Sequence, residues 1–205
     1  MKIEKVCYEI HQILSELPYC YGPMDVLSED GIYFFYEEGE TTEHSPDRMK
    51  IVRIGTHRTE GRLKVRIKLH YSGDKNSSVF RRLLGGAMMR KENPENPCLE
   101  HWEKQDAKTC PLCKPVEKRV SEYLRDKLRF RYVEVKEKEL RMRLEEGLIA
   151  TVSQCPICQP SSNWLGKYAY APEVRKSGLW VIKGVDKKPL TEEELEIFRN
   201  LVRYS

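Results

Sequence analysis

Two short apolar stretches that lie close together in the chain constrain its fold more than any other feature. Residues 31–36 read GIYFFY and residues 51–57 read IVRIGTH, and the segment between them is polar and contains Gly39 and Pro46. Short runs rich in aromatic and β-branched residues are typical of strands. One polar connection between two such strands predicts an antiparallel hairpin with a long tip.

Amphipathic helices are expected on both sides of this hairpin. The spacing of apolar residues predicts them over residues 2–17, 60–72, 76–91, 116–128, 137–153 and 191–204. Alternating residues predict a strand at 129–135, and we expect a last strand at 179–185, which reads LWVIKGV. The order of helix, hairpin, helices, strand and helices predicts an α+β protein, with helices packed on a small antiparallel or mixed sheet.

The composition narrows the class of protein. Hydrophobic residues make up 40% of the 205 positions and charged residues 33%. No apolar run approaches the roughly 18 residues of a membrane span, and charges interrupt the start MKIEKVCYEIHQIL, so we expect no signal peptide. We therefore expect a soluble cytoplasmic protein. The net charge of +4 allows a polyanionic partner without requiring one.

Cysteine spacing predicts a metal site. Four of the seven cysteines form the units CPLC at 110–113 and CPIC at 155–158. A gap of two residues lets both thiolates of a unit face one ion, and two units complete a closed four-sulfur shell. The predicted ligands of this structural zinc are Cys110, Cys113, Cys155 and Cys158. We expect residues 92–160 to include a zinc-stapled insertion within a single domain that spans residues 1–205.

A second set of zinc ligands is also present in the sequence. Cys98 and His101 have metal-ligand spacing in CLEH, and with Cys110 and Cys113 they would form a site of three cysteines and one histidine. This set leaves the CPIC unit without partners, so it ranks second. Two further cysteines lie on or beside an apolar helix face and are expected to be ordinary buried thiols: Cys7 and Cys20.

Four short motifs follow one another in a specific order along the chain. They are GIY at 31–33, RIG at 53–55, RIKLH at 66–70 and LEEGLIA at 144–150. Together they resemble the GIY-YIG nuclease superfamily, over a stretch from about Gly31 to Trp164. Two further segments are similar to one subfamily: SVFRRLLGGAM at 78–88 and SNWLG followed by RKSGLW between residues 162 and 180.

The resemblance implies a three-stranded antiparallel sheet flanked by helices, and hydrolysis of phosphodiester bonds in DNA with one divalent ion, magnesium or manganese. It places Tyr33 near the nucleophilic water, Arg66 at the scissile phosphate and Glu145 on the magnesium. Further residues are expected to contact the substrate: Arg53, Arg62, His70, Asn76 and Asn163. The DNA partners expected for such an enzyme include branched or damaged forms.

The chemistry of these residue types agrees with the implied roles. A guanidinium offers paired donors to phosphate oxygens and offsets the negative charge that develops on them. One carboxylate, completed by waters and phosphate oxygens, is sufficient to hold magnesium. The residues therefore suit a hydrolase that uses a single metal ion.

One position departs from the family pattern. Arg53 stands where the second triplet normally begins with tyrosine, and arginine cannot accept a proton. Tyr33 and His57 are the candidate general bases, since His57 follows the strand end and imidazole titrates in a suitable range. The alternative is a weak or inactive module that binds nucleic acid or protein through a basic surface: Arg58, Arg62, Lys64, Arg66 and Lys68.

Overall fold

An antiparallel sheet forms the centre of the protein. The computed structural model describes residues 2–104 and 111–203, and in this part of the chain the sheet has three strands in the order β2-β1-β3. They are β1 (Gly31–Thr41), β2 (Met49–Gly55) and β3 (Leu128–Glu134). β1 pairs antiparallel with both neighbours, which confirms the predicted hairpin and the strand after it.

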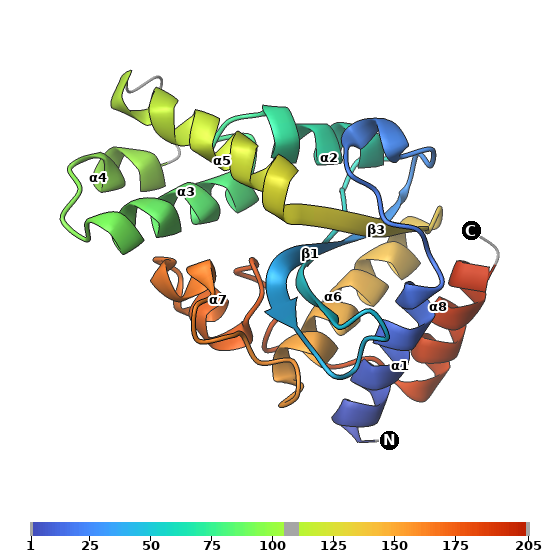
Figure 1. Cartoon of the computed structure of the whole chain (residues 1–205). Helices are drawn as coiled ribbons and strands as arrows, with labels where there is room; N and C mark the ends of the chain where they lie inside the picture. The colour runs from blue at the N-terminus through green and yellow to red at the C-terminus, as the bar shows by residue number, and fades with distance from the viewer. Residues whose placement is uncertain (1, 105–110, 204–205) are drawn as a thin grey trace.

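Helices cover both faces of this sheet, so the α+β prediction is confirmed (Figure 1). One face carries α1 (Ile3–Ser15), α6 (Lys138–Gln154) and α8 (Glu192–Arg203). The other side holds α2 (Leu63–Ser72), α3 (Val79–Glu92), α4 (Cys98–Glu103), α5 (Lys114–Lys127) and α7 (Pro172–Ser177). Short 3₁₀ helices form at Pro23–Asp25, Pro111–Cys113 and Leu165–Tyr168. Within the described ranges, no helix combines the length and the apolar character that crossing a membrane requires.

β1 separates two hydrophobic cores because its side chains alternate between the two faces of the sheet. Ile32 and Phe34 pack in the core beneath α1, α6 and α8. Tyr33 and Phe35 pack in the core beneath α2, α3 and α5. All four side chains are fully buried. Burial on both faces explains why the strand begins with an uninterrupted apolar run.

Residues 179–185 were expected to form a strand, and that prediction is wrong. The segment is irregular. Gly178 directly before it and Gly184 within it have φ angles of 67° and 88°, which lie outside the range of extended backbone. The backbone N–H of Trp180 still donates to the carbonyl of Val52 at 2.6 Å. The segment therefore runs beside β2 without forming a ladder.

Two tryptophans of the segments that resemble one GIY-YIG subfamily bind the same buried carboxylate. The indole N–H groups of Trp164 and Trp180 donate to Glu37 Oε2 at 3.1 Å and 3.0 Å. Tyr123 donates its hydroxyl to the other oxygen of Glu37. Because a buried carboxylate is stable only when its oxygens are hydrogen-bonded, this network fixes both segments against β1.

The short helix α4, which follows α3 in the chain, packs against α3. Trp102 of α4 is fully buried, and its indole N–H donates to the carbonyl of Arg82 at 2.8 Å. A Cβ atom on Gly85 would lie 2.1 Å from the Trp102 ring. The close approach of α4 therefore explains the glycine at position 85 of α3.

We expect Gly85→Ala to lower the free energy of unfolding by about 1–3 kcal/mol, because the added methyl group overpacks the rigid ring of Trp102. Gly86→Ala is the matched control, since its Cβ would come no closer than 3.4 Å to another side-chain atom. It should be neutral or stabilise the helix by up to about 1 kcal/mol. Urea denaturation measures both, and equal stabilities would contradict the packing of α4 on α3.

Candidate active site

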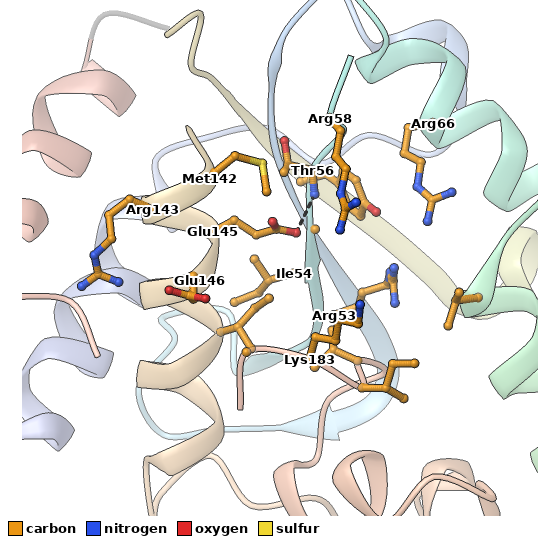
Figure 2. A pocket seen from close by; sticks show the side chains of 17 residues that line it. Arg53, Ile54, Thr56, Arg58, Arg66, Met142, Arg143, Glu145, Glu146 and Lys183 are labelled. Atoms are coloured by element: carbon orange, nitrogen blue, oxygen red, sulfur yellow. Dashed lines mark hydrogen bonds between the residues drawn. The ribbon is translucent and has the colours of Figure 1, made fainter. Parts of the chain in front are cut away.

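An open pocket brings together residues that lie far apart in the sequence (Figure 2). It is bounded by the end of β2, one side of α6, the N-terminal part of α2 and the segment 181–184. Its polar and charged lining consists of Tyr33, Arg53, Thr56, Arg58, Arg66, Arg143, Glu145, Glu146 and Lys183. A single pocket is therefore lined by three residues to which the family resemblance assigned catalytic roles: Tyr33, Arg66 and Glu145.

Glu145 extends from α6 toward the end of β2. Its Oε1 accepts a hydrogen bond from the backbone N–H of Thr56 at 3.0 Å, which fixes the carboxylate (Figure 2). Its Oε2 has no hydrogen-bond partner among the residues that the structure describes. Burial raises the pKa of Glu145, while the positive charge of Arg53 and the Thr56 hydrogen bond act in the opposite direction.

The surroundings of Glu145 fit a divalent cation. Its free carboxylate oxygen is a hard ligand beside an open pocket, and magnesium needs only one or two such groups if waters and phosphate oxygens complete its shell. The neighbouring carboxylate differs, because Glu146 lies 3.9 Å from the ammonium of Lys187. Glu145 is the better candidate for a metal ligand.

Positively charged side chains border the pocket opposite Glu145. Arg66 projects from α2 and donates from Nη1 to the carbonyl of Ser77 at 3.0 Å, which holds the guanidinium in place. Arg58 is exposed after β2, and Lys183 is exposed in the segment that runs beside β2. No motif marks Lys183. Hydrogen bonds of the Trp180 backbone with Val52 and Arg53 hold this segment beside β2, at the pocket.

Arg53 occupies the deep side of the pocket. Its guanidinium is buried, lies over the ring of Phe80 at 4.7 Å from the centroid, and donates to the carbonyl of Trp180. Burial lowers the pKa of Arg53, and the adjacent Tyr33 acts in the opposite direction. The arginine that replaces the family's tyrosine is therefore part of the packing around Tyr33.

Tyr33 is held by a chain of hydrogen bonds. Its hydroxyl lies 2.8 Å from His70 Nε2, and His70 Nδ1 lies 2.7 Å from the hydroxyl of Ser78. His70 is fully buried and, unlike Tyr33, does not line the pocket, so its contact with the substrate stays a prediction. Burial, together with three nearby guanidinium groups, lowers its pKa well below the usual value: Arg53, Arg66 and Arg81. His70 is thus a neutral positioning residue for Tyr33.

Gly55 makes room for this tyrosine. Tyr33 and Gly55 are opposite each other in the β1–β2 ladder. A Cβ atom at Gly55 would lie 2.4 Å from the Tyr33 hydroxyl oxygen. The glycine of the RIG triplet is therefore required by the position of the Tyr33 side chain.

The family of the chain follows from a comparison that covers almost all of it. The family model of the GIY-YIG domain matches residues 8–205. The chain belongs to the GIY-YIG family. Membership indicates nuclease activity on a nucleic acid, and GIY-YIG nucleases use divalent metal ions. Neither a curated protein nor a solved structure matches the chain.

His57, proposed from the sequence as a general base, lies outside the GIY-YIG pocket that holds Glu145. Its Nε2 accepts from the backbone N–H of Gly31 at 3.2 Å, and its Nδ1 lies 2.7 Å from the carbonyl of Thr59. Both ring nitrogens are therefore engaged with backbone groups. This geometry joins the ends of β1 and β2, and His57 lines a neighbouring pocket with Arg66, so its role as a general base stays a prediction.

Three other residues expected to bind substrate do not line the GIY-YIG pocket. Arg62 is exposed and lines a neighbouring pocket, to which Arg66 also contributes. Asn76 is half-buried in the turn before α3, where Lys75 donates to its side chain at 3.4 Å. Asn163 is exposed beside the buried Trp164. Substrate contacts of these three residues stay predictions.

The sequence predicted that the two CPxC units share one zinc site, but the described cysteines of the two units do not lie together. Cys113 packs in the core beneath α3 and α5, whereas Cys155 and Cys158 pack in the core on the other face of the sheet. Cys110 lies outside the described residues. Cys155 and Cys158 instead lie close to the thiol of Cys7 in α1. Cys7 is therefore not an ordinary buried thiol.

The described members of the alternative zinc set, Cys98, His101 and Cys113, lie on the α3 side of the sheet. α4, which carries Cys98 and His101, packs against the 3₁₀ helix that contains Cys113. Because its fourth member, Cys110, lies outside the described residues, this set stays a prediction.

Proposed function

We propose that this protein is a magnesium-dependent endonuclease that hydrolyses phosphodiester bonds in DNA with a single divalent ion. The observation that carries the proposal is that Glu145 of α6 and Arg66 of α2 line one pocket together with Tyr33. In this arrangement the carboxylate is the metal ligand and the guanidinium faces the phosphate. When bound, magnesium supplies Lewis-acid stabilisation of the phosphate and the leaving oxygen.

The cationic side of the pocket has the role of holding the scissile phosphate. Arg66 presents paired N–H donors to the phosphate oxygens, a geometry that a lysine ammonium does not reproduce. Arg58 and Lys183 are exposed at the same pocket and suit the flanking phosphates. Because the charge on the oxygens grows in the transition state, donors held in advance lower the barrier.

Tyr33 has the role of orienting the attacking water. If His70 donates its Nε2–H to the Tyr33 oxygen, a hydroxyl proton from Ser78 satisfies Nδ1, and the imidazole stays neutral. This agrees with the lowered pKa of His70. The Tyr33 oxygen then accepts a hydrogen bond from a water in the pocket and directs its lone pair at phosphorus.

We expect Arg66→Ala to lower kcat by about 10²–10³-fold, the effect typical of removing one transition-state donor. Arg62→Ala is the matched control, because Arg62 lies one helical turn away, is exposed and does not line the pocket of Glu145. It should weaken binding of nucleic acid modestly and leave kcat near the wild-type value. Single-turnover cleavage measures both, and equal losses of kcat would place the scissile phosphate elsewhere.

The test of the proposal is direct cleavage. The purified protein is incubated with supercoiled plasmid, duplex, flap and branched DNA and with RNA, in magnesium, manganese or EDTA. Cleavage of DNA that requires the metal supports the proposal, and preference for flap or branched DNA would define the substrate. Salt-dependent binding without cleavage under every condition would favour the binding module instead, for which Arg53 in place of tyrosine is the motivating observation.

A further inference from the structure

Three cysteines from distant parts of the chain gather on the face of the sheet that α1 and α6 cover. Their sulfur atoms all lie within 4.8 Å of one another, and all three side chains are buried. Cys7 belongs to α1, while Cys155 and Cys158 follow directly after α6. The Cys7 and Cys158 sulfurs are 3.5 Å apart. Two thiolates bound to one tetrahedral zinc at about 2.3 Å each are separated by about 3.8 Å, which this arrangement approaches.

A histidine completes the group. His11 lies four residues after Cys7 on α1, so both side chains project from one face of the helix. His11 Nε2 is 3.5 Å from the Cys158 sulfur, and the side chain is 1% exposed. Nitrogen and sulfur ligands of a tetrahedral zinc are separated by about 3.6 Å. The other ring nitrogen of His11, Nδ1, is buried without a hydrogen-bond partner in the described chain. Nε2 is therefore the ring nitrogen that faces the sulfur atoms.

A second histidine lies farther from the group. His44, in the connection between β1 and β2, has its Nε2 3.9 Å from the Cys155 sulfur. Its backbone N–H donates to Thr42 Oγ1 at 3.2 Å, which leaves the Thr42 hydroxyl proton available for the Cys158 sulfur at 3.5 Å. Thr42 therefore suits stabilisation of a thiolate, and the shorter distance of His11 makes it the better fourth ligand.

We propose that one zinc ion is bound here in a closed tetrahedral shell with four ligands: Cys7, His11, Cys155 and Cys158. The thiolate and imidazole donors match the preference of zinc, and the CPIC turn supplies two of them from a two-residue gap. A closed shell leaves no position for substrate, so this zinc is structural. It ties α1 to the C-terminal end of α6, the helix that carries Glu145, and the proposal does not depend on the nuclease activity.

Zinc content tests the site. The experiment uses untagged Cys113→Ser protein, in which the CPLC unit is disabled and any zinc counted belongs to this cluster. We expect one zinc per chain by elemental mass spectrometry. Adding Cys7→Ser or Cys155→Ser should remove it, whereas adding Cys20→Ser, a buried cysteine outside the cluster, should leave it bound. Full zinc in the Cys7→Ser protein would overturn the proposal.

The fourth ligand is tested by comparing the two histidines. His11→Ala should weaken zinc binding by at least about 100-fold, since even second-shell losses cost 10- to 100-fold. His44→Ala should leave the affinity close to that of the unchanged protein. The reverse result would overturn the assignment of His11.

Thiol reactivity in the wild-type protein tests the site if these variants do not fold. Alkylation followed by peptide mass spectrometry should find Cys7, Cys155 and Cys158 protected in the isolated protein and reactive after EDTA treatment. Equal protection with and without EDTA, or a disulfide between Cys7 and Cys158, would overturn the proposal.

Discussion

Glu145→Gln should lower the rate of metal-dependent cleavage by about 10³-fold or more. Loss of a metal ligand removes several kcal/mol of charge stabilisation, and each 1.36 kcal/mol corresponds to a tenfold change in rate. The amide keeps the shape of the side chain, and its oxygen still accepts the hydrogen bond of Thr56, so the fold is preserved. Single-turnover cleavage over a magnesium titration measures the effect.

The matched control for this variant is the next residue of α6. Glu146 lines the same pocket but lies near Lys187, so Glu146→Gln should retain close to wild-type activity. It changes the net charge of the pocket by the same amount as Glu145→Gln. Wild-type cleavage by Glu145→Gln, or equal loss in both variants, would show that Glu145 is not the specific metal ligand.

The pH dependence of the magnesium requirement is a second readout of the same carboxylate. Burial raises the pKa of Glu145 above its usual value. Because a proton and magnesium compete for the carboxylate, the magnesium concentration for half-maximal activity should rise as the pH falls through this pKa. At pH values above the pKa of Glu145, the magnesium concentration for half-maximal activity should be constant. A requirement that does not change with pH would contradict metal binding by Glu145.

Much of the fold and part of the site follow from the sequence, because they depend on local patterns. The strands carry β-branched and aromatic runs, and the helices keep an apolar face. Tyr33, Arg66 and Glu145 each lie within a regular element whose position in the chain is marked by a motif. Motif order was sufficient to predict that these three residues share one pocket.

The contacts that depend on tertiary placement were not predictable in the same way. The apolar run at 179–185 has the pattern of a strand, but the positive φ angles of Gly178 before it and Gly184 within it leave it irregular. Lys183 reaches the pocket only because this segment runs beside β2. His57 follows a motif and His70 was expected at the substrate, yet hydrogen bonds place the first against the backbone and the second against Tyr33.

The cysteines illustrate the same limit. A CPxC unit defines half of a tetrahedral site, and nothing local states which element supplies the other half. Pairing the two similar units was the simplest choice, but the sheet lies between the cores that contain Cys113 and Cys158. A usable signal was present in the first helix, where Cys7 and His11 are one turn apart, the spacing of two ligands on one helical face.

Tyr33→Phe should lower kcat by about 10²-fold or more, because the attacking water loses the group that orients it and misplacement of a reacting group costs about that much. The ring still fills its buried site, so the loss comes from the hydroxyl that lines the pocket. His70→Gln should lower kcat by a smaller factor, because the amide of glutamine replaces only part of the hydrogen bonding of the imidazole. Rapid-quench cleavage at saturating magnesium measures both, with urea denaturation to confirm that the variants remain folded.

The double variant decides whether His70 acts through Tyr33. If His70 only positions the Tyr33 hydroxyl, the combined Tyr33→Phe and His70→Gln protein should be about as slow as Tyr33→Phe alone, since the second change has nothing left to position. Independent roles would instead multiply the two losses. Losses that multiply would contradict the hypothesis that His70 acts through Tyr33. An unchanged kcat in Tyr33→Phe would show that the tyrosine hydroxyl takes no part in the reaction. Arg66 and the metal ligand Glu145 would then be the residues that act on the phosphate.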